Sequence, residues 1–107
     1  MSEYAPDRWV ILRITDSSGK TEDRVMGGWS GGYLDPDSWR LNSGCTRVVD
    51  TDDGWDVYGA SGSVYHLHRS GVGVTGLMGS VIATWERQGA TIKVIDITDL
   101  RTLSSGS

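Results

Sequence analysis

The sequence predicts an α+β protein: a mainly antiparallel sheet of five or six strands, with a central meander at residues 45–68 and one helix near 77–88 packed on it. Two local patterns support this class. Short apolar segments at 45–50, 55–59 and 63–68 are separated by hairpin-type turns, and the apolar spacing then changes to a helical period. Glycine supplies 15 of 107 residues while proline is scarce, which is typical of a turn-rich folded chain.

The N-terminal third is expected to supply a central strand. After a frayed start at residues 1–7, residues 8–15 are rich in β-branched and aromatic side chains and are apolar on both faces. Turns are predicted at 16–19 and 35–38, where aspartate, serine, glycine and proline gather. Residues 24–26 are expected to begin a second strand that ends in the glycines following them.

The meander has a register that can be predicted by counting outward from its two turns. Because side chains alternate strictly along a strand, one face should form the core. The residues predicted on that face are Val48, Trp55, Val57, Tyr65 and Leu67. On the opposite, half-polar face the same register places Asp56 directly across from His66.

The C-terminal part is predicted to hold the helix and the last strand. The apolar residues Leu77, Met78, Val81, Ile82 and Trp85 follow the spacing of an amphipathic helix. A strand is expected at 91–97. Residues 1–103 are predicted to form a single globular domain, and 104–107 a flexible tail.

Composition restricts the class of function. The net charge is −4 and the ten basic residues are scattered, which disfavours nucleic-acid binding. The single Cys45 cannot form an internal disulfide, and the N-terminus lacks the pattern of a signal peptide. No apolar run approaches the roughly 20 residues that span a bilayer. We therefore expect a protein of the cytoplasm, of a cell or of an infected host, without membrane contact.

Three glycines match a phosphate-binding pattern. Gly71, Gly73 and Gly76 have the spacing G-x-G-x-x-G between a predicted strand and a predicted helix, and Asp96 follows twenty residues later. Such glycines let backbone N–H groups approach a phosphate at a helix N-terminus. The alternative is a flexible glycine-rich connection, because the chain lacks the further βαβ units of a dinucleotide-binding fold.

Two histidines share one face of the third meander strand. With Asp56 as a third ligand, His66 and His68 would suit zinc or iron(II). The alternative is a half-exposed pair in which one histidine forms a cross-strand ion pair. We predict no metal and no cofactor.

The favoured function is non-enzymatic binding of another protein. Trp29 and Tyr33 stand among glycines and a serine, a composition used by binding surfaces, and Asp52 and Asp53 lie in an acidic turn. Trp29 could instead cap one end of the core. Small acidic proteins of this kind include inhibitors and modulators such as phage-encoded anti-defence proteins. The alternative function is nucleotide or phosphate binding at the loop from Gly71 to Gly76.

Overall fold

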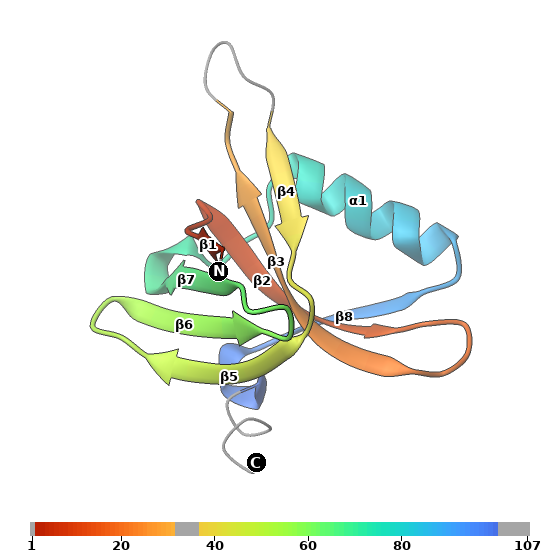
Figure 1. Cartoon of the computed structure of the whole chain (residues 1–107). Helices are drawn as coiled ribbons and strands as arrows, with labels where there is room; N and C mark the ends of the chain where they lie inside the picture. The colour runs from red at the N-terminus through yellow and green to blue at the C-terminus, as the bar shows by residue number, and fades with distance from the viewer. Residues whose placement is uncertain (1, 32–36, 101–107) are drawn as a thin grey trace.

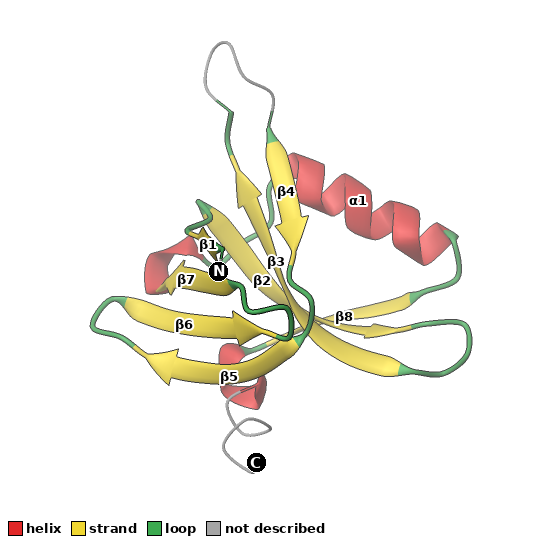
Figure 2. Cartoon of the chain, in the orientation of Figure 1, coloured by secondary structure: helices red, strands yellow, loops and turns green. Residues whose placement is uncertain are grey.

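The computed structural model describes residues 2–31 and 37–100, and within these ranges eight strands form two four-stranded sheets (Figures 1 and 2). The strands are β1 (Glu3–Tyr4), β2 (Arg8–Thr15), β3 (Thr21–Trp29), β4 (Ser38–Leu41), β5 (Cys45–Asp50), β6 (Gly54–Gly59), β7 (Val64–His68) and β8 (Thr91–Ile95). The α+β class and the mainly antiparallel pairing are confirmed, whereas the expected single sheet of five or six strands is wrong. The predicted tail at 104–107 lies outside the described residues, as do two of the four residues of the predicted turn at 35–38.

The three meander strands β5, β6 and β7 belong to one sheet, and β2, β3, β4 and β8 form the other. One sheet has the order β1-β7-β6-β5 and the other the order β4-β3-β2-β8. The pairings between these strands are antiparallel except that of β1 with β7, which is parallel. Figure 1 shows the helix α1 (Gly76–Arg87) beside the second sheet, away from the meander.

Strand β2 is central because it buries both of its faces. Trp9 and Ile11 belong to the core between the sheets, whereas Val10 and Leu12 belong to the core under α1. A strand covered on both faces is apolar at consecutive positions, which is the pattern that predicted it. The second sheet is therefore the middle layer, with the meander sheet on one face and the helix on the other.

Strand β3 is longer than the sequence predicts, because its glycines continue the strand instead of ending it. A Cβ on Gly27 would lie 2.8 Å from Pro6, and a Cβ on Gly28 would overlap the sulfur of Met78. The two glycines therefore let neighbouring elements approach β3 closely.

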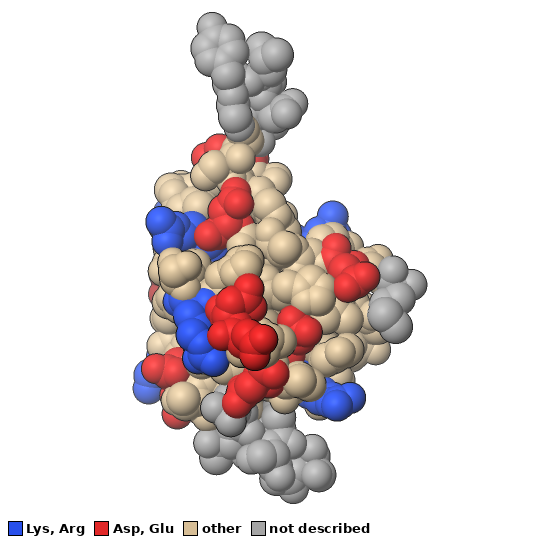
Figure 3. Space-filling view, turned by 90° about the vertical axis from the view of Figure 1, so that its left-hand side faces the viewer, with Lys and Arg blue, Asp and Glu red and all other residues tan. Residues whose placement is uncertain are grey.

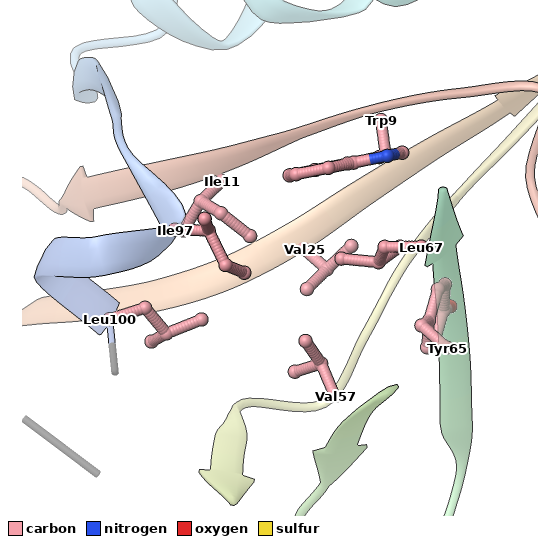
Figure 4. Packing of buried hydrophobic residues seen from close by; sticks show 8 residues of the cluster. All are labelled: Trp9, Ile11, Val25, Val57, Tyr65, Leu67, Ile97 and Leu100. Carbon is pink, nitrogen blue, oxygen red and sulfur yellow. The ribbon is translucent and has the colours of Figure 1, made fainter. Parts of the chain in front are cut away.

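The predicted register of the meander is confirmed. Val48 pairs with Val57, Val57 with Tyr65, and Asp56 with His66. The predicted core face points toward the second sheet: Val57, Tyr65 and Leu67 are buried, and Val48 and Trp55 pack against them. Figure 4 shows the side chains of Val57, Tyr65 and Leu67 facing those of β2 and β3, with Ile97 and Leu100 at one side.

The helix begins and ends within one residue of its predicted bounds, but it packs on the sheet that contains β2, not on the meander. Thr75 caps its N-terminus, because the Thr75 hydroxyl accepts a hydrogen bond from the backbone N–H of Met78 at 3.2 Å. Met78 is fully buried in the core under the helix. In the described part of the chain, no helix combines the length and the apolar character that crossing a bilayer requires.

Candidate interaction surface

The outer face of the meander sheet carries a histidine held between two carboxylates. His66 on β7 lies 2.7 Å from Asp56 on β6, through Nδ1, and 2.9 Å from Glu3 on β1, through Nε2. When protonated, the ring donates one hydrogen bond to each carboxylate. The hydrogen bond with Asp56 and then the one with Glu3 raise the pKa of His66, because both stabilise the imidazolium ion.

The second histidine of this face forms a looser pair. Nδ1 of His68 lies 3.3 Å from a carboxylate oxygen of Asp53, and both side chains are mostly exposed. Within residues 2–31 and 37–100, no group of three or more metal-ligating side chains is placed to hold a metal ion. The expected cross-strand ion pair is present between His66 and Asp56, and both ring nitrogens of His66 face carboxylates.

The turn between β5 and β6 presents exposed acidic side chains. Asp52 and Asp53 are exposed, and the turn is closed by a hydrogen bond from the N–H of Thr51 to the carbonyl of Gly54 at 2.9 Å. The N–H of Arg69 donates to the carbonyl of Asp53, which ties the turn to the end of β7. Figure 3 shows acidic side chains gathered on the side of the molecule where this turn lies. Clustered carboxylates favour a negative potential, although Figure 3 also shows basic side chains beside them.

A pocket of about 250 Å³ opens between the acidic turn and β7. It is lined by Thr51, Asp53, Trp55, Asp56, His66, Leu67 and His68. Asp53 and Asp56 place two carboxylates in its wall, and the guanidinium of Arg69 already lies 4.5 Å from the ring centroid of Trp55 nearby. Because Arg69 already covers the indole, the two carboxylates are the groups of this pocket that suit a further cationic side chain.

Trp29 lies at the end of β3, apart from the acidic turn. Its indole is half-buried, its Nε1 donates to the carbonyl of Ala5 at 3.1 Å, and its ring meets that of Tyr4 edge-on at 6.3 Å. Strand β1 pairs with the start of β7, whereas the acidic turn faces the end of that strand, a separation of about 13 Å along the strand. The structure therefore does not combine Trp29, Asp52 and Asp53 into one small site. Tyr33 lies outside the described residues.

The glycine loop connects the two sheets. Gly71 lies against the indole of Trp9, and the N–H of Gly73 donates to the carbonyl of Trp9 at 2.9 Å. The strands that flank the loop and the helix, β7 and β8, belong to different sheets and do not form a βαβ unit.

Asp96 follows β8. Its carboxylate accepts hydrogen bonds from the N–H and the hydroxyl of Thr98, which lower the pKa of Asp96. The ligand-binding role of Asp96 and the three glycines stays a prediction.

Glu3 is the member of this surface that sequence reasoning missed. Residues 1–7 were expected to be frayed, but β1 pairs with β7 and the N–H of Val64 donates to the carbonyl of Ser2 at 2.9 Å. A two-residue parallel strand has no pattern in its own sequence that predicts it, because it depends on a partner strand about sixty residues away.

The fold and this surface define a small α+β protein with two four-stranded sheets and an acidic face. No protein-family model, curated protein or solved structure matches the chain.

Proposed function

We propose that this chain is a non-enzymatic protein-interaction module that binds a basic segment of another protein through the acidic face of its meander sheet. The observation that carries the proposal is the pocket lined by Asp53 and Asp56, which adjoins the exposed Asp52. A lysine or arginine of the partner enters this pocket, and the acidic turn steers the approach.

The surroundings of the single cysteine disfavour an enzyme that uses a cysteine nucleophile. Burial raises the pKa of the Cys45 thiol, which opposes formation of the nucleophilic thiolate. Asn42 donates to its sulfur at 3.4 Å. A module of this kind acts by occupying its partner's surface, as an inhibitor or modulator does. Small acidic modulators of this kind include phage-encoded anti-defence proteins.

The experiment measures binding of a ten-residue lysine and arginine peptide by calorimetry at increasing salt. Each exposed charge pair contributes up to about 1 kcal/mol, so Asp52→Asn with Asp53→Asn is expected to weaken binding about five- to thirtyfold. Binding should also weaken as salt rises. The matched control is Glu86→Gln with Asp99→Asn, which removes the same charge from exposed positions elsewhere.

The control should bind within about twofold of the unmutated protein. An equal loss in both double variants would mean that net charge alone attracts the peptide, and binding that is insensitive to salt would contradict the proposal.

A further inference from the structure

A second pocket, of about 430 Å³, lies where β1, β4 and the start of β7 come together. Its polar lining includes Arg24, Arg40, Asn42, Ser43, Ser61 and Ser63. Among the described residues that line it, none is an aspartate or a glutamate. The chain has a net charge of −4, whereas the described lining of this pocket has two guanidinium groups and no carboxylate. The lining is therefore opposite in charge to the chain as a whole.

Arg40 supplies the uncompensated charge. Its guanidinium carbon lies 4.5 Å from the ring centroid of Tyr4, and among the described residues it forms no ion pair. Arg24 is held differently. It pairs with Glu22 at 2.7 Å and donates to the backbone carbonyl of Asn42 at 3.2 Å. The pocket therefore has one guanidinium that is fixed and neutralised and one that is available to an anion.

The remaining wall is polar and fixed in position. Asn42 is buried, and its side-chain oxygen accepts from the N–H of Val25 at 3.0 Å. Ser43 and Ser61 share a hydrogen bond at 2.9 Å, and the N–H of Ser61 donates to the Ser43 hydroxyl at 2.8 Å. Two loops that are distant in the sequence are thereby joined, so several hydroxyl groups line the pocket before any ligand binds.

Tyr65 forms part of the same wall. Its hydroxyl is protonated at neutral pH, as in any tyrosine, and burial raises the pKa of Tyr65 further, to about 12. A protonated phenol is a hydrogen-bond donor and adds no negative charge beside the arginines.

We propose that this pocket binds a phosphate dianion, either free or as the phosphomonoester of a small molecule. A phosphate has several acceptor oxygens, which match guanidinium and hydroxyl donors arranged around one cavity. The volume lies within the range of about 300–1,000 Å³ that is usual for small-molecule sites and exceeds what phosphate alone requires. This site is separate from the acidic face and does not depend on the function proposed for it.

The test is a titration followed by NMR shifts of the backbone amides of Ser61 and Ser63, at a constant ionic strength of about 0.15 M. The probes are inorganic phosphate, ribose 5-phosphate and unphosphorylated ribose. Saturable shifts with a Kd of about 1 mM or tighter are expected for one or both phosphates, and none for ribose. Tighter binding of the ester assigns the site to phosphomonoesters, and tighter binding of inorganic phosphate assigns it to the free ion.

The variants identify the pocket as the binding site. Arg40→Gln should weaken phosphate binding at least about tenfold, because it removes a charge-assisted hydrogen bond. Arg47→Gln is the matched control, because it makes the same charge change at an exposed position of β5 outside the pocket lining. It should leave the Kd for phosphate within about twofold. Ser61→Asp, at an exposed position, should abolish binding by placing a carboxylate in the pocket.

Three results would overturn the proposal. These are the absence of saturable shifts with both phosphates, equal shifts with unphosphorylated ribose, and equal weakening in Arg40→Gln and Arg47→Gln.

Discussion

Replacing Trp29 by alanine tests whether this side chain is a core residue or is available as a binding anchor. The indole is half-buried at the end of β3 and has two neighbours from the N-terminal segment, the ring of Tyr4 and the carbonyl of Ala5. Trp9 gives the reference for a core tryptophan. It is 2% exposed and donates to the carbonyl of His68 at 2.7 Å.

The contacts of Trp29 set the expected loss of stability. Half of the roughly 3 kcal/mol for complete burial of a large apolar side chain is about 1.5 kcal/mol. The edge-on contact with Tyr4 adds about 0.5 kcal/mol. The hydrogen bond to Ala5 is exposed and adds about 0.5 kcal/mol. Trp29→Ala should therefore lower the free energy of unfolding by about 2.5 kcal/mol, whereas Trp9→Ala should lower it by about 4–5 kcal/mol.

Urea denaturation with an unchanged m-value measures both losses. Trp29→Phe serves as a control that keeps a ring against Tyr4 and removes the donor, with an expected loss of about 1 kcal/mol. A loss of about 4 kcal/mol or more for Trp29→Ala would show that the indole is core and would remove it as an anchor. No loss would show that the contacts with Tyr4 and Ala5 contribute nothing.

Three further measurements test the other structural claims. The pKa of His66 should lie above about 6.5 and fall in Asp56→Asn. Because the folded pKa is raised, the pair stabilises the fold fully below the unfolded pKa and loses this effect as pH rises through the folded pKa. The loss should be well under about 1 kcal/mol, since both side chains are partly exposed to solvent. An NMR titration in which Asp56→Asn leaves the pKa unchanged would contradict the pairing. Met78→Ala should cost about 3 kcal/mol in urea denaturation, since the side chain is fully buried, and a loss below about 1 kcal/mol would mean that α1 is not packed there. Calorimetry with mono- and dinucleotides tests the glycine-loop alternative. A heat of binding that disappears in Gly73→Ala would support nucleotide binding by the loop, and the absence of any heat of binding with the unmutated protein would exclude it.

Local sequence patterns predicted β2, the three meander strands, α1 and β8, together with the pairing inside the meander. The two short turns of the meander leave a single register in which Val57, Tyr65 and Leu67 share a face, and that register is the one observed. The spacing of its apolar residues predicted the helix, and apolar residues at consecutive positions predicted β2. These features depend on neighbours within about a dozen residues, so the sequence alone determines them.

Tertiary structure decided how the elements assemble and therefore which side chains meet. No local pattern states that β2 and the meander belong to separate sheets, or that β1 pairs with β7 across about sixty residues. That pairing brings Glu3 to His66 and places Tyr4 under the guanidinium of Arg40. A pairing between distant segments depends on the burial and hydrogen bonding of the whole folded chain. The sequence of one segment does not identify its partner. For this reason the sequence identified the acidic turn, while only the fold revealed the second carboxylate at His66 and the arginine pocket.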